Sequence, residues 1–205
     1  MQLFYSAPSP YARKARIVVR EKGLLDDVIE RECNPFIDPA ELRAVNPLGK
    51  VPTLATDTLA LYDSVLICEY LDALGEAPKL VPIEPGERRW RVLRGQALGD
   101  GVLDLAVSLT LERRRAQHER SRWFRTRWES QIATALDAMQ DEIDTLPPTI
   151  TLAAVTFVAA LGYLDFRHPA LEWRSGRTAL ADWYEQVIAR SSLADTVPAE
   201  PSGTL

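Results

Sequence analysis

Cysteine, histidine and long apolar stretches are scarce in this sequence. Only two cysteines, Cys33 and Cys68, and two histidines, His118 and His168, occur among the 205 residues. Two cysteines exclude a disulfide framework, and we expect both to be buried structural thiols. Neither histidine has a Cys, His or Asp partner at ligand spacing, so we predict no metal site. No apolar run approaches the roughly 18 residues of a membrane span, and the amino terminus lacks the basic segment of a signal peptide. We therefore expect a cytoplasmic protein with no membrane partner.

Positive charge is also in deficit. The chain has 24 Lys and Arg against 29 Asp and Glu, a net charge of −5 with a pI of about 5.2, which argues against nucleic acid as its main partner. Seven arginines lie between residues 113 and 127, interspersed with Glu and Trp. This pattern is typical of a solvated helix face, although it could attract acidic substrates. Hydrophobic residues make up 46%, enough to bury a sizeable core in one large domain or two small ones.

The first third of the chain alternates strands and helices. Ser9 is a good N-cap, Pro10 a good first helical residue, and Gly23 a helix stop. We expect strands at 2–6, 28–32, 52–56 and 59–62, and helices at 10–22, between 38 and 46, and at 64–74. Because a helix joins the first two strands, they should be parallel, whereas the last two form an antiparallel hairpin. The sequence therefore predicts a small mixed α/β sheet with helices packed on it.

The composition changes after Gly75. Three prolines, at 78, 82 and 85, indicate a linker. Beyond it no convincing strand appears, and long helices are expected over 87–117, 121–146, 152–166 and 177–190. We expect Gly99 and Gly101 to bend or interrupt the first of these. The predicted domains are an α/β domain at 1–77, a linker at 78–85 and an all-helical domain at 86–205.

Residues 46 to 54, within the predicted α/β domain, begin as a loop and continue as a strand. Asn46-Pro47 and Gly49 cannot continue a helix, whereas the residues from Val51 onward suit a strand. Pro52 gives its peptide bond access to the cis form. A cis turn would aim the N–H and C=O of Val51 out of the sheet, where an extended peptide-like ligand could pair with them.

Three segments together, in the same order as in the family, resemble the glutathione S-transferase family. They are Ser9-Pro10-Tyr11-Ala12, residues 46–54, and residues 63–71 (Asp-Ser-Val-Leu-Ile-Cys-Glu-Tyr-Leu). The resemblance covers the full length of the chain, including the helical second domain. The resemblance implies a thioredoxin-like N-terminal domain, an all-α C-terminal domain, a homodimer, and glutathione as co-substrate. The first segment is similar to the Cys-Pro-Phe/Tyr turn of omega-type transferases and glutaredoxins, with Ser9 in place of the nucleophilic cysteine.

The resemblance implies that Ser9 holds and activates the glutathione thiol at the positive end of the first helix. The plainer interpretation, that Ser9 only caps the helix, stays open. Tyr5 and Tyr11 are rival hydroxyls. Tyr5 has apolar strand neighbours, which favours a packing role, and Tyr11 could line the mouth of the site. A serine cannot form a mixed disulfide, which favours conjugation or peroxide reduction over thiol exchange.

The remaining glutathione contacts are also implied by the resemblance. The backbone of Val51, before a cis Pro52, would bind the cysteinyl part, and Lys50 would attract the glycine carboxylate. Ser64 would hold the γ-glutamyl carboxylate at a helix N-terminus, and Asp63 would accept the ammonium group. Plain alternatives remain, namely a solvated Lys50, a trans Pro52, and Asp63 and Ser64 as helix caps.

The implied activity is attack of glutathione thiolate on a small electrophile or peroxide, as in detoxification. The electrophile would lie between the first domain and the helices from residues 87 and 121, near Tyr11, Asp100 and Asp104. Two alternatives stay open: a non-catalytic glutathione-binding or regulatory protein, and a glutathione-dependent isomerase. Isomerases of the zeta type carry a Ser-x-Cys/Ser pair after the first strand, and Tyr11 and Ala12 break that pattern here.

Overall fold

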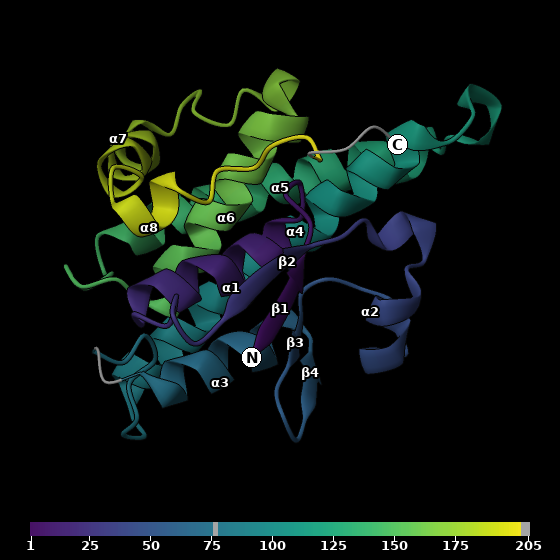
Figure 1. Cartoon of the computed structure of the whole chain (residues 1–205). Coiled ribbons are helices and arrows are strands. Elements are labelled where there is room, and N and C mark those ends of the chain that lie inside the picture. Colours follow the sequence, from purple (N-terminus) through teal and green to yellow (C-terminus); the bar gives the residue numbers. More distant parts are fainter. Residues whose placement is uncertain (76–77, 202–205) are drawn as a thin grey trace. The chain divides into compact units, whose positions relative to one another are not determined.

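The computed structural model describes residues 1–75 and 78–201 (Figure 1). The chain forms two compact units, one of Met1–Ile83 with the residues from Arg190 onward, the other of Glu84–Ala189. The expected boundary at residue 77 lies outside the described residues. The division into 1–77, 78–85 and 86–205 stays a prediction.

The first unit contains a four-stranded sheet in the order β2-β1-β3-β4. The bounds are β1 Gln2–Tyr5, β2 Ile29–Glu32, β3 Thr53–Ala55 and β4 Ala60–Tyr62. β1 and β2 pair in parallel and β3 and β4 pair antiparallel, as expected from the connections. β3 also pairs antiparallel with β1, which joins the two halves of the sheet. The parallel pair requires a crossover, which α1 (Pro10–Glu21) supplies.

The helices of the first unit pack on this sheet and on one another. α1 and α3 (Ser64–Leu74) lie together, and the short α8 (Ser191–Ala194) packs against α1 (Figure 1). Val18 on α1 and Leu71 on α3 are both completely buried. The 3₁₀ turn η1 (Pro35–Ile37) and α2 (Ala40–Val45) connect β2 to β3.

A buried aspartate fastens the start of the expected linker to the first unit. The carboxylate of Asp72, on α3, lies 3.1 Å from Nζ of Lys22 and accepts hydrogen bonds from the N–H groups of Leu80 (3.0 Å) and Val81 (3.3 Å). Leu80 and Val81 are themselves buried. This part of the proline-rich segment is therefore held by specific contacts.

The described residues of the second unit form helices joined by turns and contain no strand. Its helices are α4 Glu87–Arg114, α5 Arg122–Ile143, α6 Leu152–Arg167 and α7 Thr178–Val187, with 3₁₀ turns η2 Gln117–Glu119 and η3 Pro169–Leu171. α6 is buried at every position from Leu152 to Leu164, which makes it the central helix. α4 packs against both α5 and α6. In the described residues, no helix has the length and apolar character needed to cross a membrane.

Gly99 and Gly101, two of the three glycines of α4, do not interrupt the helix as expected. α4 runs through both without a break, so the predicted interruption is wrong. A Cβ at Gly99 would lie 2.6 Å from the methyl carbon of Thr156 and 3.2 Å from the ring of Phe157, both on α6. Gly99 therefore lets the two helices approach closely, whereas a Cβ at Gly101 would meet no heavy atom within 4 Å.

Candidate functional site

The antiparallel register gathers the three motif segments at one end of the sheet. Phe4 in β1 lies opposite Thr53 in β3, and Thr53 lies opposite Tyr62 in β4. The chain therefore leaves β1 for α1, enters β3, and leaves β4 for α3 at the same end (Figure 1). Two helix N-termini and one irregular loop meet there.

Ser9 caps α1 as the sequence predicts. Its half-buried Oγ accepts a hydrogen bond from the N–H of Ala12 at 3.2 Å, and Pro10 follows as the first helical residue. A hydroxyl has two acceptor positions and one proton, so capping leaves the O–H of Ser9 able to donate to a sulfur anion. The capping role and the thiol role are therefore compatible.

A buried polar network holds the loop before β3. The amide of Asn46, which is fully buried, donates to the carbonyl of Lys50 (3.0 Å) and to Oγ1 of Thr53 (2.8 Å), and Thr53 donates to the same carbonyl (2.8 Å). Sequence analysis assigned Asn46 only to ending a helix and Thr53 only to a strand. Asn46 and Thr53 are polar residues on either side of the loop, and this placement in the sequence could have indicated that they bond to each other.

This loop presents an unpaired stretch of backbone. The Val51–Pro52 peptide bond is cis, as expected. Across residues 1–75 and 78–201, neither the N–H nor the C=O of Val51 takes part in an internal hydrogen bond. Both groups are open to pairing with an extended backbone, since Val51 is only half-buried.

The start of α3 contains two residues of the third segment. Asp63 is exposed, has φ of 78°, and its Oδ1 accepts from the N–H of Val65 at 2.9 Å. A non-glycine residue in this left-handed region costs about 1–3 kcal/mol, and such residues cluster at functional sites. Ser64 is buried, and its Oγ accepts a hydrogen bond from Nζ of Lys14, on α1, at 3.3 Å. In the sequence Lys14 is one more basic residue of an amphipathic helix, and nothing there indicates this contact.

The rival tyrosines differ in their surroundings. The guanidinium of Arg16 lies 4.3 Å from the centre of the Tyr5 ring, and burial raises the pKa of the Tyr5 hydroxyl. The contact with Arg16 and the burial both support the packing role expected for Tyr5. Tyr11 is half-buried in the first turn of α1.

The cysteines have the surroundings of structural thiols. Cys68 is completely buried on α3, and Cys33 is half-buried at the end of β2. Burial, followed by the charge of Glu41, raises the pKa of the Cys33 thiol, which keeps it protonated at neutral pH.

Candidate residues in the second unit remain less defined. Asp100 is half-buried and Asp104 is exposed on α4, and their role toward an electrophile stays a prediction. The described residues contain no group of three or more His, Cys, Asp or Glu side chains placed to hold a metal ion. His168 is fully buried, with Nε2 2.8 Å from the carbonyl of Ala106 and 2.9 Å from Oγ1 of Thr110.

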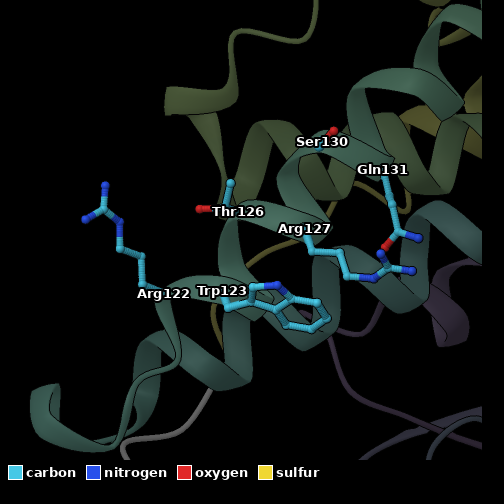
Figure 2. Close-up of a pocket in the computed structure, with 6 residues that line it drawn as sticks. All are labelled: Arg122, Trp123, Thr126, Arg127, Ser130 and Gln131. Atoms are coloured by element: carbon cyan, nitrogen blue, oxygen red, sulfur yellow. The ribbon is translucent and has the colours of Figure 1, made fainter.

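A separate open hollow lies along α5. Figure 2 shows its lining: Arg122, Trp123, Thr126, Arg127, Ser130 and Gln131. The side chains of Trp123 and Arg127 lie next to each other, with the guanidinium 5.6 Å from the ring centre. The hollow takes its lining from a single helix and shares no residue with the three motif segments.

Comparison with protein families matches the chain twice. Residues 8–74 match the model of the glutathione S-transferase N-terminal domain, and residues 114–186 match that of the C-terminal domain. The first match includes all three motif segments.

Individual relatives match over almost the whole chain. An uncharacterized GST-like protein of Escherichia coli, YibF, is 33% identical over 97% of this chain and 98% of its own. A stringent starvation protein A homolog of Histophilus somni is 27% identical over 96% and 90%. The crystal structure of a glutathione transferase family member from Pseudomonas fluorescens, with bound glutathione, is 37% identical with a TM-score of 0.92, covering 97% and 98%.

Proposed function

Because this chain belongs to the glutathione S-transferase family, we propose that it binds glutathione at the motif end of its sheet and activates the thiol. The observation that carries the proposal is the convergence of Ser9, the unpaired backbone of Val51 and the start of α3 at that end. The glutathione bound to the similar Pseudomonas fluorescens protein supports it.

Glutathione would lie as an extended strand beside the loop before β3. Its cysteinyl backbone pairs with the N–H and C=O of Val51, next to Pro52. Its γ-glutamyl carboxylate accepts from Ser64 at the start of α3, and its ammonium group meets the exposed carboxylate of Asp63. Lys50, whose side chain is exposed, attracts the glycine carboxylate.

The sulfur would lie at the start of α1. The hydroxyl of Ser9 donates to it, and the partial positive charge of the helix N-terminus stabilises the thiolate. The released proton goes to solvent. The thiolate then attacks an electrophilic carbon and displaces its leaving group. With a peroxide it attacks one oxygen instead, so that the O–O bond breaks, the sulfur is oxidised to a sulfenic acid, and the alkoxide leaves as an alcohol after taking a proton from solvent. Proximity and the lowered thiol pKa supply the catalysis.

Further parts of the proposal come from the family resemblance. Tyr11, Asp100 and Asp104 are proposed to contact the electrophile. A cytoplasmic homodimer remains the expected form of the protein.

A second candidate is a glutathione-binding protein without turnover, since one relative over nearly the full chain carries a stringent starvation name rather than a transferase name. Calorimetry with glutathione, together with turnover of chlorodinitrobenzene and an organic hydroperoxide, separates the two. Binding with turnover of either substrate supports the enzyme. Binding without turnover of any electrophile or peroxide favours the second candidate, and the absence of binding refutes both.

A further inference from the structure

Lys14 is a fully buried cation beside the proposed glutathione site. Its side chain is 0% exposed, and its Nζ donates to Oγ of Ser64, itself 5% exposed, at 3.3 Å. The two residues belong to different helices, α1 and α3. The ammonium group of Lys14 therefore lies one turn into α1 and against the start of α3, directly behind the Ser64 hydroxyl.

The contact determines what the Ser64 hydroxyl can do. One of its acceptor positions is taken by Lys14, so its own proton is directed to another acceptor. Ser64 is also the first residue of α3, where a backbone N–H has no helical carbonyl to bond. Two donors and a positive charge behind them are therefore arranged to receive an anion.

We propose that Lys14 is a positioning residue for the α-carboxylate of the γ-glutamyl group, because it orients the Ser64 hydroxyl outward and supplies the compensating charge. The inference rests on the proposed function and makes it more specific. The subsite selects peptides with a free carboxylate at this end, so glutathione is preferred over an analogue without it.

The test compares two ligands by calorimetry: glutathione and 4-aminobutyryl-cysteinylglycine, which lacks only the γ-glutamyl α-carboxylate. In Lys14→Met we expect glutathione affinity to fall about tenfold or more, as for loss of a charge-supported hydrogen bond, and analogue affinity to change about twofold or less. Lys14→Arg restores the charge with different geometry, so glutathione affinity should recover most of the loss.

Arg13 provides a matched control on the same helix. It is also buried, but its guanidinium donates to the carbonyl of Leu193, beside α1, at 3.3 Å. Arg13→Met should therefore lower thermal stability while changing the affinities for the two ligands by the same factor. If Lys14→Met does not fold, Lys14→Gln, which keeps a donor without the charge, replaces it in the same comparison.

Several results would overturn the inference. If Lys14→Met lowers the affinities for both ligands by the same factor, Lys14 has a structural role only. If glutathione affinity is unchanged in this variant, Lys14 has no role in binding. An arginine variant no better than the methionine variant contradicts the role of charge. A wild-type protein that binds glutathione and the analogue equally overturns the inference alone, whereas one that binds neither refutes the proposed function as well.

Discussion

Replacing Ser9 by alanine tests the proposed mechanism most directly. The change removes the Oγ that accepts from the N–H of Ala12 at 3.2 Å, and with it the hydroxyl proposed to donate to the glutathione sulfur. Loss of the cap alone should lower the free energy of unfolding by about 1 kcal/mol. This part of the effect is independent of glutathione and is measured on the free protein.

The effect on the thiol is calculated separately. A hydrogen bond to a charged acceptor contributes about 1.5–3 kcal/mol, and one pKa unit corresponds to about 1.4 kcal/mol. The pKa of the bound thiol should therefore rise by about one to two units, and turnover below that pKa should fall about tenfold to a hundredfold. The N–H groups at the start of α1 remain, so activity should not vanish.

The assay follows the ultraviolet absorbance of bound thiolate against pH, together with turnover of chlorodinitrobenzene and glutathione affinity. The matched control is Ser121→Ala, because Ser121 caps α5 in the same way, with Oγ accepting from the N–H of Phe124 at 3.3 Å. Both variants should lose similar stability, but only Ser9→Ala should shift the thiol pKa. Glutathione affinity should change little in either.

An unchanged thiol pKa and unchanged turnover in Ser9→Ala would refute the reasoning. The role in activation would then pass to Tyr5, Tyr11 or the backbone amides of α1. A loss of turnover that Ser121→Ala reproduces would instead trace the effect to helix stability.

Three further predictions concern other parts of the chain. Asp63→Asn keeps the capping oxygen and removes the negative charge. Calorimetry should show a glutathione affinity lower by about fivefold or less, as for loss of an exposed ion pair, with thermal stability nearly unchanged. A larger loss of affinity would contradict the assignment of an exposed ion pair. Gly99→Ala should lower the free energy of unfolding by about 1–3 kcal/mol, because its Cβ would lie 2.6 Å from a methyl carbon of α6. Gly101→Ala, which meets no neighbour, should raise it by about 0.5–1 kcal/mol, and equal effects in denaturant unfolding would contradict the packing account. Burial lowers the pKa of His168 from its usual 6.5. Below about pH 6.5 the imidazole is therefore protonated more in the unfolded chain than in the folded chain, so the free energy of unfolding falls as the pH drops. His168→Gln should flatten this dependence in melting curves between about pH 5 and 7, and an unchanged slope would contradict the account.

Local sequence signals predicted most elements of the first unit. Ser9 and Pro10 begin α1 at the expected residue, and the parallel β1–β2 pair and the antiparallel β3–β4 hairpin follow from the connections. These features depend on a few neighbouring residues, whose conformational preferences act wherever they occur. The same locality explains the wrong expectation of an interruption at Gly99, because the helix-breaking tendency of glycine was considered without α6, which packs closely against that residue.

The sequence by itself determined which segments form helices and strands, and its three motif segments determined the family resemblance. Only the tertiary structure decided that Lys14 contacts Ser64, that Asp72 holds Leu80 and Val81, and that Gly99 faces α6. The reason is physical. Capping and turn preferences act over three or four residues, whereas a contact between Lys14 and Ser64 joins positions fifty residues apart. Such a contact exists only because α1 and α3 pack side by side, and the energy of that packing is shared among many residues.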